Sequence, residues 1–197
     1  MNLTEMRARV RQDLQHEDAA NYRWTDDEVD GAIERAVKDF SFRYPLQQQD
    51  DIATVDDSSE IDISSLSKLI KVYSVEFPIG SKPPYYQRFS VWQSTLYITD
   101  TGNGDDARIR WGKLHTLDAA SSAIPEQFDE IIVLGATGYL ATSASAYTVD
   151  RATIAGRHAT INFRAWGRER LARYEQKLRS IALDNRIVTK EFYTDDY

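Results

Sequence analysis

The chain of 197 residues contains no cysteine. This absence excludes disulfides, thiolate zinc sites and cysteine nucleophiles. Histidine is scarce as well, since only His16, His115 and His158 are present. They lie far apart in the sequence and in unlike predicted elements, so no metal-ligand spacing is visible, and we interpret each as a surface or packing residue. We therefore predict that the protein holds no metal and no cofactor.

Long apolar runs are also missing. No stretch approaches the roughly 20 apolar residues that cross a bilayer. The N-terminal sequence MNLTEMRARVRQDL alternates charged with apolar residues, where a signal peptide would carry an apolar core. Hydrophobic residues make up 42% of the chain and charged residues 28%, which is typical of globular proteins. We expect a protein that is made in the cytoplasm, contacts no membrane and folds as one domain with room for an insertion.

Catalytic motifs are absent too. The sequence GNG at residues 102–104 lacks the lysine and the following helix of a phosphate-binding loop, and we interpret it as a hairpin loop. No G-x-S-x-G motif is present. Aspartate pairs such as 26–27, 56–57 and 105–106 lie at predicted helix starts and turns, where capping and solubility explain them. We predict that the protein is not an enzyme, with a hydrolase whose carboxylates meet only in space as an alternative.

Charge is distributed unevenly along the chain, whose net charge is −7. Residues 1–150 hold 14 Lys and Arg against 25 Asp and Glu, residues 151–179 hold 8 against 2, and residues 180–197 hold 2 against 4. A basic segment of this size can contact phosphate or an acidic protein surface. We favour a subunit or partner contact, because the rest of the chain is acidic and no base-reading helix-turn-helix is visible. A DNA-binding regulator is the alternative. The cations expected to make the contacts are Arg164, Arg168, Arg170, Arg173 and Lys177.

Two short antiparallel helices are predicted at the N-terminus. Leu3, Met6, Val10 and Leu14 recur at helical spacing, which predicts a helix over residues 4–17.

The sequence YRWTDDEVDGAIERAVKDFS, residues 22–41, predicts a well-defined start of the second helix. Thr25 is a good N-cap, and Glu28 three residues later completes a capping box. Trp24 and Val29 occupy the two positions of a hydrophobic staple. A single apolar stripe follows until a proline ends the helix.

Beyond residue 45 the apolar periodicity changes from helical to alternating. The stretches DIATVD, SSEIDIS, KLIKVYSVEFP, PPYYQRFSVWQSTLYITD and ARIRWGKLH predict short strands. The glycines and asparagine of TGNGDD suit a loop that needs positive φ, so we expect the last strand to pair as a hairpin with the strand before it. Residues 46–118 are thus predicted to form a small antiparallel β unit inserted between helices.

Helical patterns resume after this unit. The sequence IPEQFDEIIVLGATGYLATSASAY predicts a helix whose first turn begins at Pro125. Its many Gly, Ala and Ser residues let another backbone approach closely, so we expect this helix to be central or to pack against a neighbouring subunit. A last helix is predicted over residues 159–183. Residues 185–197 are partly apolar and aromatic with no obvious core to join, which predicts a docking tail.

The predicted fold class is therefore α+β. A helical bundle is expected from residues 1–45 and 119–184, with an inserted small antiparallel β unit over residues 46–118 and an extended C-terminal tail over residues 185–197.

Two of these stretches, LTEMRARVRQDLQ at residues 3–15 and YRWTDDEVDGAIERAVKDFS at residues 22–41, resemble a recurring segment of head-to-tail adaptor (connector) proteins of tailed bacteriophages. In similar proteins an opening helix, a W-[ST]-D-[DE]-[EL]-[VIL]-D type motif and a second amphipathic helix form the core of a helical bundle. The close match covers about a quarter of the chain. The remainder is similar in layout, with a β insertion, two longer helices and a tail.

The resemblance implies a structural protein of the virion neck, made in the bacterial cytoplasm, that forms a homo-oligomeric ring, typically dodecameric. Such a ring attaches beneath the portal protein, extends the DNA channel without recognising sequence, and docks downstream neck or tail proteins. Another phage neck or tail-completion protein is the nearest alternative. By position alone, the resemblance assigns portal docking to the tail residues Arg186, Ile187, Val188, Phe192, Tyr193 and Tyr197.

Overall fold

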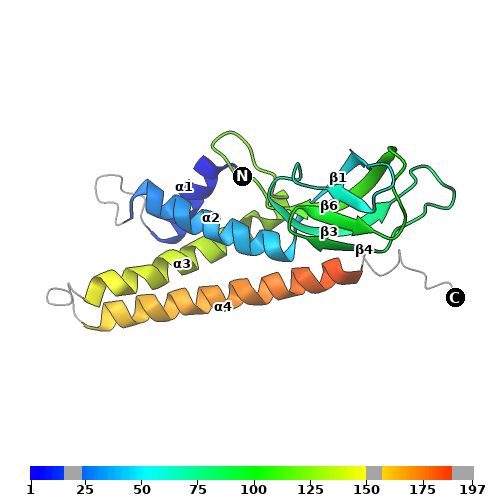
Figure 1. The fold of residues 1–197 in the computed structure, drawn as a ribbon. Coiled ribbons are helices and arrows are strands. Elements are labelled where there is room, and N and C mark those ends of the chain that lie inside the picture. The colour runs from blue at the N-terminus through cyan, green and yellow to red at the C-terminus, as the bar shows by residue number, and fades with distance from the viewer. Residues whose placement is uncertain (16–23, 150–156, 188–197) are drawn as a thin grey trace. The chain divides into compact units, whose positions relative to one another are not determined.

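The computed structural model describes residues 1–15, 24–149 and 157–187 (Figure 1). Over these residues the chain is a mixed α+β protein with four α-helices and two small antiparallel sheets, which confirms the predicted class. It divides into two compact units. The helical unit consists of Met1–Tyr44 and His115–Tyr197, and the β unit consists of Pro45–Leu114.

The first helix, α1, spans Leu3–Asp13. It begins one residue earlier than predicted because Asn2 is a side-chain cap. The Asn2 side chain accepts a hydrogen bond from the Glu5 N–H at 2.9 Å, and the Glu5 carboxylate accepts one from the Asn2 N–H at 2.9 Å. The helix also ends earlier than the predicted residue 17, since Gln15 has a left-handed φ of 54°.

Helix α2 spans Asp26–Arg43 and begins with the predicted capping box. The Thr25 hydroxyl accepts from the Glu28 N–H at 3.2 Å, while the Glu28 carboxylate accepts from the Thr25 N–H at 2.8 Å. Trp24 and Val29, the two predicted staple positions, are both buried in the same core.

The acids at the start of α2 also bind α1. Arg7 contacts both carboxylate oxygens of Asp30 at 2.8 and 2.6 Å, and Arg11 donates to Asp26 at 2.6 Å. The Arg11 guanidinium lowers the pKa of Asp26. Arg11 also reaches the carbonyl of Trp24 at 3.1 Å, so two arginines of α1 fix the start of α2 in addition to its own cap.

The remaining helices follow the β unit. A short 3₁₀ turn, η2, covers Glu126–Phe128 after Pro125, and α3 spans Asp129–Val149. Helix α4 spans Arg157–Ile187, a longer range than the predicted residues 159–183. Helices α3 and α4 lie side by side (Figure 1).

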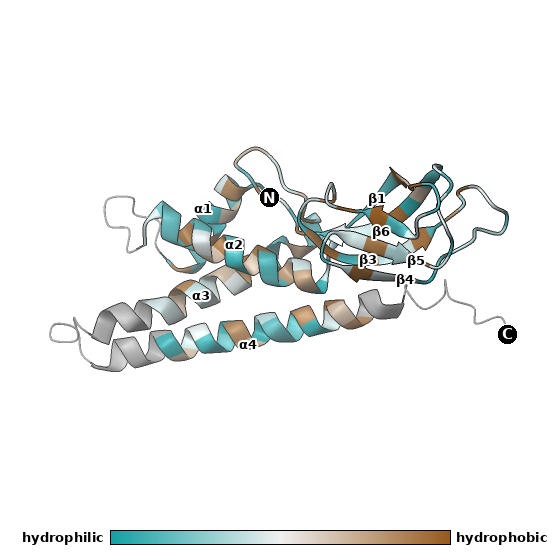
Figure 2. Cartoon of the chain, in the orientation of Figure 1, coloured by the Kyte–Doolittle hydropathy of each residue, from teal (hydrophilic) through white to brown (hydrophobic). Residues whose placement is uncertain are grey.

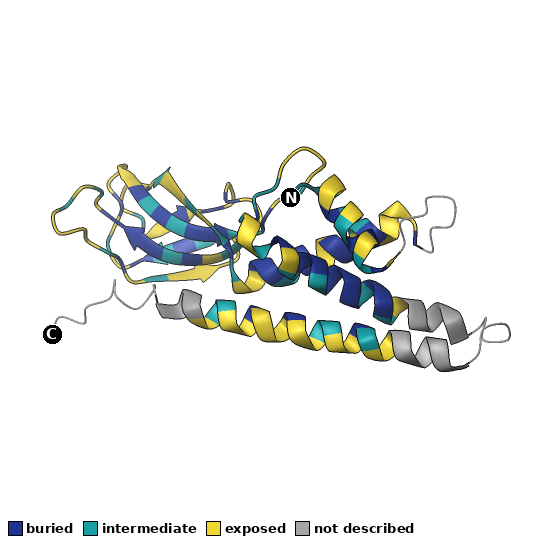
Figure 3. Cartoon of the chain, turned by 180° about the vertical axis from the view of Figure 1, so that it is seen from behind, coloured by how far each residue is buried: buried dark blue, intermediate teal, exposed yellow. Residues whose placement is uncertain are grey.

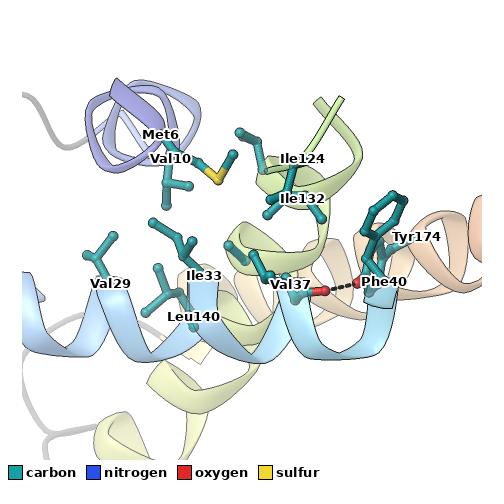
Figure 4. Close-up of a cluster of buried hydrophobic side chains, with 14 of the residues drawn as sticks. Met6, Val10, Val29, Ile33, Val37, Phe40, Ile124, Ile132, Leu140 and Tyr174 are labelled. Atoms are coloured by element: carbon teal, nitrogen blue, oxygen red, sulfur yellow. Dashed lines mark hydrogen bonds between the residues drawn. The ribbon is translucent and has the colours of Figure 1, made fainter. Parts of the chain in front are cut away.

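The core of the helical unit is built from all four helices. Hydrophobic positions recur along one side of α2 among hydrophilic ones (Figure 2), and these side chains point toward α1, α3 and α4 (Figure 4). Burial of each large apolar side chain contributes roughly 1.5–3 kcal/mol. The fully buried members include Met6, Val10, Val29, Ile33, Phe40, Ile132 and Tyr174.

The β unit contains two three-stranded antiparallel sheets, ordered β1-β6-β3 and β2-β5-β4. One hydrophobic core draws side chains from strands of both sheets, among them Ile61, Val75, Leu96 and Ile109. The strands are β1 Leu46–Ala53, β2 Glu60–Asp62, β3 Leu69–Glu76, β4 Phe89–Trp92, β5 Thr95–Ile98 and β6 Asp106–Lys113.

The predicted hairpin between the last two strands is wrong. β6 pairs with β1 and β3, whereas β5 pairs with β2 and β4. Gly104 does adopt a positive φ of 82°, but the loop hydrogen bonds elsewhere: Gly102 N–H donates to Ser58 at 2.8 Å and Thr54 N–H donates to Asp105 at 3.0 Å. These bonds satisfy backbone groups of the loop without a β5–β6 hairpin. β6 is instead the central strand of the β1-β6-β3 sheet.

Two glycines of the helical unit provide a matched test of packing. Gly31 lies inside α2, is exposed, and an added Cβ would meet nothing within 4 Å, whereas at Gly135 of α3 it would lie 2.9 Å from the Tyr174 ring. We expect Gly31→Ala to raise the free energy of unfolding by about 0.5–1 kcal/mol and Gly135→Ala to lower it by about 1–3 kcal/mol. Urea unfolding of both variants checks this, and equal shifts would contradict the described packing.

His115 is buried where the chain re-enters the helical unit. Its ring lies 5.1 Å from that of Phe40, and its Nδ1 is 3.2 Å from the hydroxyl of Ser41. Burial lowers the pKa of His115 to about 4.

This low pKa makes stability depend on pH. In the unfolded chain the imidazole of His115 has its ordinary pKa of about 6.5 and binds a proton below that pH, whereas the buried imidazole of the folded protein stays neutral. The free energy of unfolding should therefore fall as the pH drops from about 6.5 to 4, by roughly 3 kcal/mol from this group. The His115→Gln variant should show a correspondingly flatter curve of unfolding free energy against pH. Parallel curves for the two proteins would rule out this role of His115.

Candidate assembly surface on helix α4

Over residues 164–183, whose burial the structure describes, helix α4 packs against α3 with one side. Tyr174 and Leu178 are buried on this side, with 1% and 5% of their surface exposed. Tyr174 lies against Gly135 and Leu171 against Gly138, where a Cβ would come within 2.9 Å of each side chain. The small residues of α3 predicted to admit another backbone are thus used, at these positions, by α4 of the same chain.

Two tyrosine hydroxyls anchor this packing. Tyr174 donates to the backbone carbonyl of Ala36 in α2 at 2.6 Å, and Tyr139 of α3 donates to the carboxylate of Asp39. Burial raises the pKa of Tyr174 well above its usual value, and burial together with the Asp39 contact raises the pKa of Tyr139 to about 12. Both phenols therefore stay neutral donors at physiological pH. The Arg35 guanidinium covers the Tyr139 ring at 4.1 Å.

Arg170, one of the predicted contact residues, is used inside the molecule. Its Nη1 donates to the Asp13 carboxylate at 2.7 Å and to the Thr137 hydroxyl at 3.1 Å. Its guanidinium also lies 4.4 Å from the centre of the Trp166 ring. Arg170 thus fixes α4 to α1 and α3, a role that the sequence did not reveal.

The other four predicted cations are exposed. The side of α4 seen in Figure 3 is largely exposed. Arg173 pairs with Glu169 one turn away at 2.6 Å. An exposed pair of this kind stabilises a helix by only about 0.2–0.5 kcal/mol. Helical geometry places Arg164 and Arg168 on one flank of α4 and Arg173 and Lys177 on the other. The exposed side therefore carries positive charge on both flanks.

A groove lies between α2 and α4. Its lining includes the buried side chains of Tyr174 and Leu178 and that of Phe42, which has 63% of its surface exposed. Two arginines and two acids also line the groove, so its charges balance. Its volume is about 470 Å³. We call it the α2–α4 groove. It is lined by Asp39, Phe42 and Arg43 of α2, Tyr139 of α3, and Tyr174, Glu175, Leu178 and Arg179 of α4.

The β unit presents a second exposed surface that the sequence analysis did not single out. In β5 the alternate residues Leu96 and Ile98 are buried. Thr95 and Tyr97 therefore lie on the opposite face of the sheet, together with the residues of β2 and β4 that pair with them. Trp92 is the most exposed of the large hydrophobic side chains that the structure describes, at 70%. The alternation of FSVW and TLYI is the sequence signal that would have found this surface. We call it the outer sheet face: Glu60 and Asp62 of β2, Thr95 and Tyr97 of β5, and Ser90 and Trp92 of β4.

The predicted portal-docking residues lie at the end of α4 or beyond it. Because the helix extends to Ile187, Arg186 and Ile187 are helical, although the tail was predicted to begin at residue 185. The other four lie outside the described residues: Val188, Phe192, Tyr193 and Tyr197.

The described parts of the chain bring together charge and apolar surface rather than reactive groups. Over residues 1–15, 24–149 and 157–187, no group of three or more His, Asp or Glu side chains is placed to hold a metal ion. Nor does any helix among them have the length and apolar character needed to cross a membrane. No protein-family model matches the chain, and no curated protein sequence matches it.

The free energy of unfolding should distinguish Arg170, which binds other helices of the same chain, from an exposed arginine of α4. We expect Arg170→Gln to lower the free energy of unfolding by about 1–2 kcal/mol, because it leaves the partly buried Asp13 carboxylate without its cation. The exposed neighbour Arg168→Gln should change it by less than about 0.5 kcal/mol. Chemical denaturation of the two variants makes the comparison, and an equal loss in both would show that Arg170 is not a packing residue.

Proposed function

We propose that the protein is a structural head-to-tail adaptor of a tailed bacteriophage. It forms a ring beneath the portal, extends the DNA channel and docks the tail. The observation that carries the proposal is the one-sided packing of α4. This helix has 31 residues, a length of about 46 Å at 1.5 Å per residue, and its exposed side is basic in an otherwise acidic chain.

A ring of identical subunits suits this distribution of charge. A head-to-tail contact joins two different surfaces of the chain, so each subunit needs complementary patches in two places. The positive patch consists of the exposed cations Arg164, Arg168 and Lys177. The negative charge comes from the excess of acids in residues 1–150. Complementary charge fixes the register of such contacts and suppresses wrong partners.

The segment that resembles phage adaptors serves as a rigid support in this proposal. The capping box at Thr25 and Glu28 and the ion pairs from Arg7 and Arg11 define the start of α2. These acids are already engaged in folding contacts. We therefore place the partner contacts elsewhere, on α4 and in the C-terminal residues 188–197.

In the finer form of the proposal, the C-terminal residues 188–197 dock on the portal. Deleting them should leave ring formation unchanged and weaken binding to the portal protein of the same virus by roughly tenfold or more, since buried aromatic side chains dominate such contacts. The cut follows Ile187, so that α4 is kept whole. Electron microscopy of the mixture and a binding titration provide the measurements.

A matched control keeps the length of the tail and removes only its aromatic rings, as Phe192→Ser with Tyr193→Ser. Full portal binding by both the deletion and this control would refute portal docking by the tail. A ring that binds a downstream tail protein but no portal would instead indicate a tail-completion protein. Tight binding of the isolated protein to duplex DNA, falling steeply with salt, would favour the DNA-binding regulator.

A further inference from the structure

We propose that Asn103 is a site of spontaneous covalent modification. The backbone nitrogen of Gly104 displaces the side-chain amide of Asn103 to give a succinimide, which water converts to aspartate and isoaspartate. The two residues belong to the GNG sequence at residues 102–104, for which the proposed adaptor function has no role. The reaction concerns the β unit alone and does not depend on that function.

The Asn-Gly dipeptide forms the exposed tip of a loop whose two flanks are held by hydrogen bonds. On one flank the Gly102 N–H donates to the carbonyl of Ser58 at 2.8 Å. On the other flank the carbonyl of Asp105 accepts from the Thr54 N–H at 3.0 Å. Both residues of the dipeptide are exposed, whereas Gly102 is buried. Water and base therefore reach the tip, while the bonds on either side hold the loop in place.

The nucleophile is the backbone nitrogen of Gly104. Glycine has no Cβ to shield this nitrogen, and the φ of 82° lies in the left-handed region that favours glycine. Within the part of the chain that the structure describes, the Gly104 N–H makes no hydrogen bond. Its attack on Cγ of the preceding asparagine closes a five-membered ring, an intramolecular step that needs no encounter between separate molecules.

Asp105 contacts both ends of the side-chain amide of Asn103. Its N–H donates to Oδ1 of Asn103 at 3.1 Å, and its carboxylate accepts from Nδ2 at 2.7 Å. The N–H thus lies where negative charge develops on Oδ1 when the nitrogen adds to Cγ. The carboxylate lies beside the departing nitrogen, where it can pass on a proton.

The reaction needs no reagent other than water. The bond between the Gly104 nitrogen and Cγ of Asn103 forms as that nitrogen gives up its proton. The Cγ–Nδ2 bond then breaks, and the proton is carried to Nδ2, so ammonia leaves. Water opens the succinimide at either of its two carbonyls. One opening gives aspartate, and the other gives isoaspartate, in which the main chain runs through the former side chain and is one methylene longer.

The products change the charge of a loop that is already acidic. Either product places a carboxylate beside that of Asp105, in place of the amide that donated to it. The carboxylate of Asp56 is close as well, since a Cβ added at Gly104 would lie 3.1 Å from its Oδ1. Like charges at this spacing repel, and isoaspartate also lengthens the main chain between the two held flanks. We expect the modified protein to unfold at a lower urea concentration than the unmodified protein.

The test incubates the full-length protein at mildly alkaline pH and follows it by peptide mass spectrometry. The tryptic peptide of residues 89–108 carries Asn103 as its one asparagine. We expect its mass to rise by that of one deamidation, in aspartate and isoaspartate forms that chromatography separates. Four other asparagines are internal controls that should react at least about tenfold more slowly, because a residue with a large side chain follows each: Asn2, Asn21, Asn162 and Asn185.

Two variants test the geometry of the loop. Gly104→Ala should slow the reaction roughly tenfold or more, because the new Cβ shields the nitrogen and a positive φ is strained for alanine. Asp105→Asn retains an oxygen that can accept from Nδ2 of Asn103 but cannot carry the proton, so it should slow the reaction too. The matched control is Asp106→Asn, which removes the charge of the next exposed acid and should leave the rate unchanged. Circular dichroism confirms that each variant is folded.

The outcomes separate the parts of the proposal. Equal rates for Asp105→Asn and Asp106→Asn would overturn the role of the Asp105 carboxylate. Aspartate without isoaspartate would exclude the succinimide. None of these results bears on portal binding, so the adaptor function is decided by its own test. Conversion of Asn103 to both products in the folded protein supports the modification site, whereas an intact Asn103 under conditions that convert the isolated peptide of residues 89–108 would overturn it.

Discussion

The helical unit depends on the close approach of α4 to α3 at Tyr174. The ring fits against Gly135 only because that residue has no Cβ, and the hydroxyl reaches past α3 to the carbonyl of Ala36 in α2. One side chain thereby links three helices and satisfies its own polar atom in a buried setting. Once α4 is held in this way, one side of it is buried and the other is exposed.

This packing also divides the arginines of α4 by function. A side chain at the margin of the buried side, Arg170, reaches Asp13 and Thr137 and becomes part of the scaffold. Arg164 and Arg168 are exposed on one flank of α4. Arginine thus stabilises the fold at one position and is exposed at another, and the angle around the helix axis separates the two. The same angle brings Arg179 to the groove beside α2.

The adaptor proposal asks for a basic exposed helix and for a C-terminal segment that meets the portal. A ring beneath a channel needs subunits that bind their neighbours with one surface and present a different region to the portal.

The sequence by itself determined the local structure. Thr25 and Glu28 define a helix start through atoms three residues apart, and this start was predicted correctly. Alternation of apolar residues located most of the strands, but β1 begins at Leu46, before the predicted stretch at residues 51–56. The partner of β6 was not, because strand pairing depends on which distant backbone satisfies the loop at Gly102. Tertiary structure alone likewise decided that Arg170 is bound within the helical unit and that the α2–α4 groove exists. Those features depend on contacts between residues far apart in the chain, which local spacing does not encode.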